Sequence, residues 1–311
     1  MRLLRPAGRG MRGGRRLLGA VVVVTVLLAA CSSGGSPERE DPLIRPGLGD
    51  FTFKGYAPLG DRPVRVWYDA PADPSTAQIL IVMHGMGRNA EGYRAAWHEY
   101  VEPNNVLVLV PEFSEEFYPG EMYSVGNMVD GDGDLQPEAK WSFHVVEALF
   151  DFVVREMGSR TRDYALFGHS AGAQFVHRFV EFMPAHRARI AVAANAGWYT
   201  TLDNSVPFPY GLDGAPSQQS VPKRALASNL VVMLGADDIE TESDSLRRDS
   251  QADAQGRNRL DRGMNFYQTS RTVAARESIE FRWRLAVLPG VAHSHHDVAP
   301  LAAPLLLTNA R

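Results

Sequence analysis

The chain has 311 residues and a formal net charge of −4, and 45% of its residues are hydrophobic and 22% charged. These proportions are those of an average soluble globular protein, and they exclude a disordered chain and a protein with many membrane spans. Domains average about 150 residues but vary widely in length, so the chain is long enough for one large α/β domain or two ordinary ones.

The first 30 residues differ from the rest of the chain. Six arginines come before any acidic residue, and residues 17–30 are almost wholly apolar up to Cys31. An apolar run this short does not span a bilayer but suits the core of a secretory signal peptide, so we expect export. Without these six arginines the body carries a formal charge of −10. We expect no binding of nucleic acid, because contacts to phosphate need a basic surface.

Cys31 is the only cysteine of the chain, so one mature chain cannot form an internal disulfide. It follows Leu28-Ala29-Ala30, and the four residues together resemble the lipobox of bacterial lipoproteins, in which the cysteine is acylated and becomes the new N-terminus. This resemblance implies a lipoprotein signal peptide over 1–30, a fatty acyl group such as palmitate on Cys31, and attachment to the membrane of the bacterial cell envelope. The alternatives are an ordinary cleaved signal peptide and an uncleaved anchor helix.

Residues 51–311 are expected to form one α/β domain, preceded by a flexible tether over 31–50 that is rich in Ser, Gly, Pro and charge. From Phe51 onward, short β-rich runs alternate with longer amphipathic segments, which is typical of a mainly parallel sheet covered by helices. We expect strands at 51–53, 64–68, 79–83, 106–110, 164–168, 190–194, 230–234 and 281–288, and helices at 141–153, 173–182 and 301–307.

Two long segments, 113–140 and 203–228, are rich in Pro, Gly, Asp, Ser and aromatic residues. Long irregular segments inside a compact domain are usually functional loops or lids. Each follows a predicted strand, so we expect both at the sheet edge where open α/β sheets bind ligands.

The pentapeptide Gly168-His169-Ser170-Ala171-Gly172 matches the pattern G-x-S-x-G. It lies between a predicted strand and a predicted helix, so the chain turns sharply at Ser170. Such a turn pushes the serine hydroxyl out at the sheet edge, and the flanking glycines remove side chains that would clash with the strained backbone. The pattern therefore predicts that Ser170 is a nucleophile.

The predicted strand at 79–83 runs into His84-Gly85-Met86-Gly87. A turn of this kind can present backbone N–H groups to the oxyanion of a tetrahedral intermediate, and such preset donors lower the barrier of acyl transfer. We expect the backbone N–H groups of Met86 and Ala171 to form this oxyanion hole. The alternative for the segment is a plain turn after a buried strand.

These features together resemble the α/β-hydrolase superfamily over roughly residues 51–311. The stretch from His84 to Ala90, with Tyr93, is similar to the corresponding stretch in its esterase and polyhydroxyalkanoate depolymerase-like branches. The resemblance implies an α/β-hydrolase fold, with a mainly parallel central sheet and helices on both faces. It also implies a catalytic triad in the chain order serine, acid, histidine.

The acid of this superfamily usually lies three residues after a glycine that follows a strand, which selects Asp238 after Gly235 and leaves Asp237 as the alternative. The segment from Gly290 to His293 resembles the Gly-x-x-His loop of the superfamily. His293 would then be the base, a task suited to a group that titrates near neutral pH. His295 and His296 are close enough in the sequence to be alternatives.

Two clusters also allow a metal to be considered. The run from His293 to Asp297 contains common ligands, but its spacing is not that of binuclear metallohydrolases. Asp130, Asp132 and Asp134 have the spacing that opens a calcium loop, but Leu135 stands where that loop needs glycine. We expect a solvated acidic loop there, and neither a metal nor another cofactor in the protein.

The sequence as a whole predicts a serine acyl hydrolase, most specifically a carboxylic ester hydrolase, that works through a Ser-His-Asp triad and an acyl-enzyme intermediate. The expected substrate is a small-molecule or polymeric ester. A triad defines the acyl step and leaves the pocket unspecified, so a lipid-anchored peptidase or acyltransferase on the same fold is one alternative. Another is a binding lipoprotein that keeps the fold without turnover.

Overall fold

The computed structural model describes residues 42–183 and 185–307. The predicted signal peptide at 1–30, Cys31 and the first part of the predicted tether, through residue 41, lie outside the described residues. The central sheet has eight strands in the order β1-β2-β4-β3-β5-β6-β7-β8. The strands are β1 Gly47–Phe53, β2 Val64–Ala70, β3 Gln78–Met83, β4 Val106–Glu112, β5 Tyr164–His169, β6 Ala188–Ala194, β7 Leu230–Gly235 and β8 Arg284–Leu288.

The sheet is mainly parallel, as the sequence predicts. Strands β1, β2 and β4 pair antiparallel at one edge, whereas all pairs from β4 to β8 are parallel. The first strand begins four residues before the strand predicted at 51–53, because Gly47 to Asp50 already pair with β2. These four residues include two glycines and no run of β-branched side chains, so their pairing comes from the register with β2 and not from local propensity.

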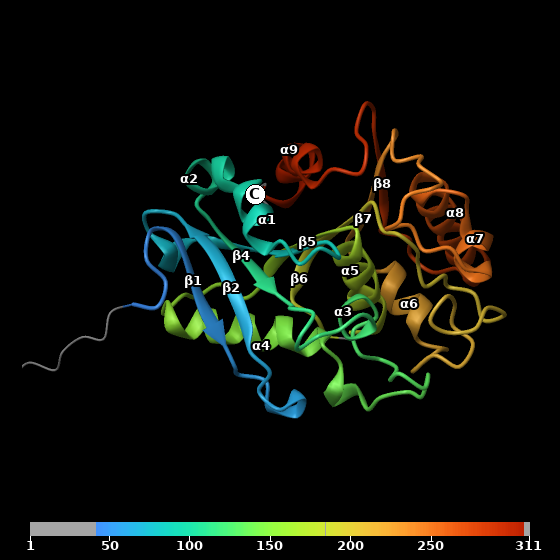
Figure 1. Cartoon of the computed structure of the whole chain (residues 1–311), viewed down its shortest axis with the longest axis horizontal. Helices are drawn as coiled ribbons and strands as arrows, with labels where there is room; N and C mark the ends of the chain where they lie inside the picture. Colours follow the sequence, from blue (N-terminus) through green and yellow to red (C-terminus); the bar gives the residue numbers. More distant parts are fainter. Residues whose placement is uncertain (1–41, 184, 308–311) are drawn as a thin grey trace, which may run out of the picture. The chain divides into compact units, whose positions relative to one another are not determined.

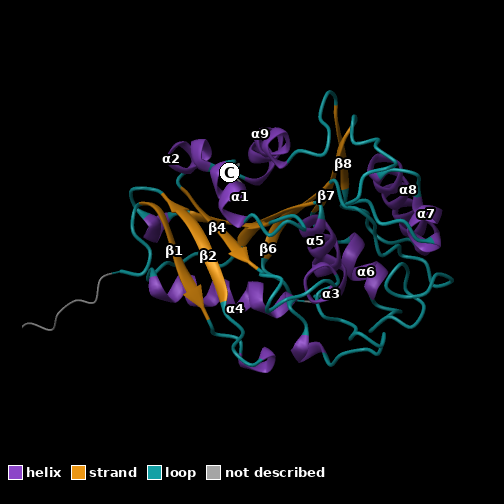
Figure 2. Ribbon diagram, viewed as in Figure 1, coloured by secondary structure: helices purple, strands orange, loops and turns teal. Residues whose placement is uncertain are grey.

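Helices cover both faces of the sheet. They are α1 Ala90–Ala95, α2 Val101–Asn104, α3 Glu121–Ser124, α4 Phe143–Glu156, α5 Ala171–Phe182, α6 Val221–Leu226, α7 Ser250–Gln255, α8 Arg259–Glu277 and α9 His295–Leu306. Figure 1 shows α1, α2 and α9 on one side of the sheet and α4 on the other, and Figure 2 shows the strands running between these layers. No helix of the described residues is long and apolar enough to cross a membrane.

The alternation of side chains along the strands divides the core into two layers. Ile79 and Ile81 of β3 pack in the layer that contains α4, α5 and part of α8, while Leu80 and Val82 pack in the layer that contains α1, α2 and α9. Successive side chains of a strand point to opposite faces, so a continuous apolar run is what a strand covered on both sides requires. The runs in β3 and β4 therefore occupy the centre of the sheet, as expected.

The parallel pairing brings the carboxyl ends of several strands to one edge. Met83 at the end of β3 lies opposite Gly168 of β5, and Gly235 at the end of β7 lies opposite Leu288 at the end of β8. The segments that follow these four residues are the ones that hold the predicted site residues. The register of the sheet thus brings together residues that lie more than 200 positions apart along the chain.

Candidate active site

Ser170 lies in the turn between β5 and α5, with φ 58° and ψ −117°. This positive φ is strained for a residue with a side chain. The neighbouring glycines are needed for close packing: a Cβ on Gly168 would lie 2.2 Å from the carbonyl oxygen of Gly172, and a Cβ on Gly172 would lie 2.1 Å from that of Met83. The sharp turn expected from the sequence is present, and it is held between β3 and β5.

Ser170, His293 and Asp238 form a continuous chain of hydrogen bonds. Ser170 Oγ lies 3.1 Å from His293 Nε2, and His293 Nδ1 lies 2.7 Å from Asp238 Oδ2. An ionised carboxylate only accepts hydrogen bonds, so Nδ1 carries the proton and Nε2 is free to accept one from the serine hydroxyl. The structure places Asp238, and not Asp237, against the imidazole; the Asp237 side chain is exposed.

Asp238 is almost fully buried, and a second charged side chain accompanies it. Arg259, at the start of α8, places Nη1 3.5 Å from Asp238 Oδ1, and each side chain is 2% exposed. Arg259 Nη2 also donates to Ser245 Oγ at 2.8 Å. No local pattern in the sequence connects Arg259 to an aspartate 21 positions earlier, so this contact is not predicted from the sequence.

The turn after β3 is organised by the buried His84. The backbone N–H of Phe113 donates to His84 Nε2 at 3.1 Å, so Nδ1 carries the proton and donates to the carbonyl oxygen of Gly85 at 2.8 Å. Tyr123 Oη donates to the carbonyl oxygen of His84 at 2.7 Å. Burial lowers the pKa of His84 to about 4, so the ring is neutral near pH 7 and serves to hold the turn.

Met86 and Ala171 lie on the two segments that flank Ser170. The N–H of Ala171 is the first of α5, and the Met86 N–H lies within the turn closed by the hydrogen bond from Arg88 N to Gly85 O, 3.2 Å long. Within residues 42–183 and 185–307, neither N–H has a hydrogen-bond acceptor. Two unpaired donors at this edge are compatible with an oxyanion hole.

The other histidines near Ser170 pack beside the triad and not within it. His295 stacks on Tyr93 with 4.0 Å between ring centroids, and His169 Nδ1 lies 2.9 Å from Tyr93 Oη. Burial lowers the pKa of His295 to about 4 and that of His169 well below its ordinary value. Both rings are therefore neutral near pH 7, which leaves His293 as the imidazole in contact with the serine.

A cavity of about 440 Å³ opens beside Ser170, where Met86 and Ala171, the next residue in the chain, contribute to its lining and Ser170 itself does not. Its walls come from the turn after β3, the start of α5, the segment 113–140 and a loop before α7. The lining residues are Met86, Arg88, Glu115, Gly120, Glu121, Tyr123, Ser124, Ala171, Gln174, Gly197, Trp198, Asp244, Ser245, Leu246 and Arg247. Segment 113–140 lines the cavity as expected, whereas no residue of 203–228 does. Loop 244–247 has few apolar residues and no recognisable pattern, so its place in the cavity wall is not predicted from the sequence.

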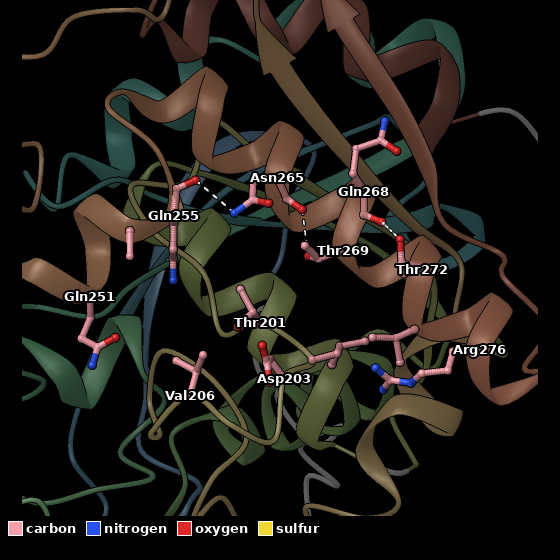
Figure 3. A pocket seen from close by; sticks show the side chains of 13 residues that line it. Thr201, Asp203, Val206, Gln251, Gln255, Asn265, Gln268, Thr269, Thr272 and Arg276 are labelled. Carbon is pink, nitrogen blue, oxygen red and sulfur yellow. Dashed lines mark hydrogen bonds between the residues drawn. The ribbon is translucent and has the colours of Figure 1, made fainter.

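A second cavity of about 470 Å³ lies away from the triad, between residues 201–206 and helices α7 and α8 (Figure 3). Its polar side chains are largely engaged with neighbouring backbone. Thr269 Oγ1 donates to the carbonyl oxygen of Asn265 at 2.8 Å, and Asn265 Nδ2 donates to that of Gln255 at 3.2 Å. These hydrogen bonds join and cap α7 and α8. The polar side chains of this cavity therefore have a structural role that needs no ligand.

The acidic loop is closed by its own hydrogen bonds. Asp130 Oδ1 accepts from the N–H groups of Asp132 and Asp134 at 3.1 and 3.0 Å, and Gln136 Nε2 donates to Asp130 Oδ2 at 2.9 Å. This is the turn chemistry that aspartate commonly provides. In the part of the chain that the structure describes, no group of three His, Cys, Asp or Glu side chains is arranged to hold a metal ion.

No family model matches the chain, and no curated protein sequence matches it. Among solved structures, poly(aspartic acid) hydrolase-1 from Sphingomonas sp. KT-1 is 42% identical with a TM-score of 0.81, and the match covers 85% of this chain and 100% of that one. LpqC, a poly(3-hydroxybutyrate) depolymerase from Bordetella parapertussis, is 30% identical with a TM-score of 0.78, and the match covers 84% of this chain and 90% of that one.

A more distant structure, FphF, a fluorophosphonate-binding serine hydrolase from Staphylococcus aureus, is 13% identical with a TM-score of 0.55. The match covers 85% of this chain and 100% of that one, and it shows the fold alone. The sheet order and these similarities confirm the α/β-hydrolase fold expected from the sequence.

Proposed function

The chain belongs to the α/β-hydrolase family that includes poly(aspartic acid) hydrolase-1 and the LpqC depolymerase, and it is therefore a hydrolase. On this basis we propose that it is a carboxylic ester hydrolase with Ser170 as its nucleophile. The observation that carries this proposal is the pair of hydrogen bonds that join Ser170 to His293 and His293 to Asp238, 3.1 and 2.7 Å long. Such a constellation supports nucleophilic acyl transfer.

In the proposed reaction Ser170 Oγ attacks the ester carbonyl carbon while its proton passes to His293 Nε2. The carbonyl oxygen becomes an oxyanion, which accepts hydrogen bonds from the N–H groups of Met86 and Ala171. The intermediate collapses when the C–O bond to the alcohol breaks and His293 returns the proton to the leaving oxygen. Water, deprotonated by His293, then attacks the acyl-enzyme and releases the acid and the free serine.

Asp238 has a supporting role in this scheme. Its carboxylate accepts the Nδ1–H of His293, which fixes the tautomer of the ring and stabilises the imidazolium formed during proton transfer. The substrate is a small-molecule or polymeric ester. The cavity of about 440 Å³ beside Ser170 lies in the size range of ligand pockets, and LpqC is a depolymerase of a polyester.

Labelling with a fluorophosphonate tests the proposal. The wild-type protein should be labelled, and Ser170→Ala should abolish the label together with ester turnover. Ser243→Ala is a matched control, because Ser243 lies in a cavity beside His293 but bonds to Ser245 at 3.0 Å and not to the imidazole; it should keep the label. A folded wild-type protein that is not labelled would contradict the serine-hydrolase mechanism and favour a binding protein.

We further propose that the protein is exported and anchored by an acyl chain on Cys31, with the envelope membrane as its site. The support is the leader at 1–30 and the lipobox-like sequence that ends at Cys31. Metabolic labelling with a palmitate analogue should mark the wild-type chain, and Cys31→Ser should remove the mark. Ser32→Ala is the control, and a label that persists in Cys31→Ser would refute acylation at this cysteine.

A further inference from the structure

Both arginines that line the cavity beside Ser170 are already paired with carboxylates. Arg88 Nη2 lies 2.6 Å from a carboxylate oxygen of Glu115, and its Nη1 donates to the carbonyl oxygen of Phe113 at 2.8 Å. The Arg88 side chain is only 12% exposed. It therefore braces segment 113–140 and does not present a free donor to a ligand.

Arg247, in loop 244–247, also has its charge paired. Its Nε lies 2.7 Å from Asp249 Oδ2 and its Nη1 lies 3.4 Å from Glu121 Oε1. Its guanidinium carbon lies 4.9 Å from the ring centroid of Trp198. Burial opposes ionisation of Asp249, but hydrogen bonds from Tyr210 and Arg247 outweigh it and lower the pKa of Asp249 to about 2, so this pair is fully charged near pH 7.

A third arginine lies behind the cavity wall. Like Arg247, Arg178 packs on the ring of Trp198, and its guanidinium carbon lies 3.9 Å from the ring centroid. It donates through Nη1 to the carbonyl oxygens of Ser124 and Gln174 at 3.0 and 3.1 Å, and it has no exposed surface. Its charge interacts with those of Glu121 and Arg247, which line the cavity, but the buried guanidinium cannot bond a ligand there.

The carboxylates outnumber these cations. Three carboxylates and two arginines line the cavity: Glu115, Glu121 and Asp244, with Arg88 and Arg247. One further carboxylate, Asp249, and one further arginine, Arg178, lie directly behind this lining. Asp244 has neither an ion pair nor a hydrogen bond through its side chain with any other residue in the described ranges. Among the rest of the lining, Met86, with 59% of its surface exposed, Trp198 and Leu246 offer apolar contacts.

We infer that this site selects esters whose acyl and alcohol groups are uncharged and discriminates against anionic ones. The inference rests on the proposed function and concerns the same serine. A carboxylate on the substrate would meet an excess of negative charge and no unpaired cation, and it would lose its hydration without compensation. The chain would then differ from its 42% identical relative, since poly(aspartic acid) carries a carboxylate on every residue.

A matched substrate pair tests this selectivity. Methyl butyrate and monomethyl succinate have acyl groups of the same length, but a carboxylate replaces the terminal methyl group in the second. At low ionic strength the wild-type kcat/KM for methyl butyrate should exceed that for monomethyl succinate by about tenfold or more. Added salt should narrow the gap, because it screens charges in an open cavity.

The double variant Glu121→Gln with Asp244→Asn should reduce the selectivity ratio by about three- to tenfold at low salt, because it removes two of the cavity carboxylates. Its control is Glu102→Gln with Glu280→Gln, which changes the net charge equally at exposed positions outside the cavity lining. The control should keep the wild-type ratio.

Three outcomes would overturn the inference: equal or faster hydrolysis of the anionic ester, a ratio that the cavity variant does not change, or a protein that is labelled by fluorophosphonate and hydrolyses neither ester. In the last case the proposal of a serine hydrolase remains supported, and only the substrate class assigned to it is refuted. Absence of labelling would instead refute the proposed function itself.

Discussion

Asp238 Oδ1 and Arg259 Nη1 lie 3.5 Å apart in an ion pair that is almost completely buried. The same arginine bonds Ser245 at 2.8 Å, and Ser245 lines the cavity beside Ser170. Arg259 thus connects the carboxylate that orients His293 to a loop that contacts substrate in the proposed site. We expect it to act as a positioning residue.

Replacement of Arg259 by Met should lower kcat/KM by about 10- to 100-fold and destabilise the protein by about 3 kcal/mol, because it leaves a buried carboxylate without its cation. Arg259→Lys should restore part of the activity. A folded Arg259→Met protein with the kcat/KM of the wild type would reduce the role of Arg259 to packing.

The two adjacent aspartates after β7 provide a second prediction. Asp238→Asn should lower kcat by about 10⁴-fold, because the amide no longer fixes the His293 tautomer. Asp237→Asn should stay within about twofold of the wild type, since its side chain is exposed and surface changes are usually small. Steady-state kinetics on one ester settles the comparison, and a reversed order would place the acid at Asp237.

Gly172 tests the packing of the turn that holds Ser170. Gly172→Ala places a Cβ 2.1 Å from the carbonyl oxygen of Met83, so the backbone must shift. We expect a loss of about 3 kcal/mol in the free energy of unfolding, measured by urea denaturation. Gly131→Ala is the control, since no heavy atom lies within 4 Å of its added Cβ, and its effect should be within about 0.5 kcal/mol. Equal stability of the two variants would argue against the packing described.

Acidification should destabilise the fold through His84. Burial lowers its pKa from 6.5 to about 4 in the folded protein, so between these values the unfolded chain binds more protons. The contribution of His84 to the free energy of unfolding is therefore fully present above pH 6.5. It is lost as the pH drops to about 4, which lowers the free energy of unfolding by about 3 kcal/mol. His295, whose pKa burial also lowers to about 4, contributes in the same direction.

Urea denaturation at several pH values between 7.5 and 4.5 measures this dependence. His84→Asn should be less stable at pH 7.5, because it loses hydrogen bonds to Gly85 and Phe113, yet it should show a shallower loss on acidification. A wild-type slope retained in His84→Asn would rule out His84 as a source of the pH dependence.

Local patterns in the sequence were sufficient for the central strands and for the order of the segments around Ser170. The apolar runs of β3 and β4 need burial on both faces, and a serine between two glycines after a strand needs a sharp turn; both requirements are local. The resemblance to a superfamily led to Asp238 and His293, and the structure places His293 against Ser170 and Asp238 against His293.

Other features depend on contacts that no local pattern encodes. Helix α8 was not expected, because its 19 residues are mostly polar and only a few, such as Phe266 and Val273, face the core. The pairing of Gly47 to Asp50 with β2, the approach of Arg259 to Asp238 and the position of loop 244–247 all arise from tertiary packing.

The close contact between Gly172 and Met83 packs the turn that carries Ser170 tightly against the end of β3, directly before the turn that carries Met86. Segment 113–140 is bonded into this unit, because Phe113 and Tyr123 form hydrogen bonds with His84. Loop 244–247 instead contacts the site through the hydrogen bond from Arg259 to Ser245. Exchanges in loop 244–247 should therefore change one wall of the cavity and leave the packing around Ser170 intact, whereas exchanges at Phe113 or Tyr123 should also disturb the turn that carries Met86.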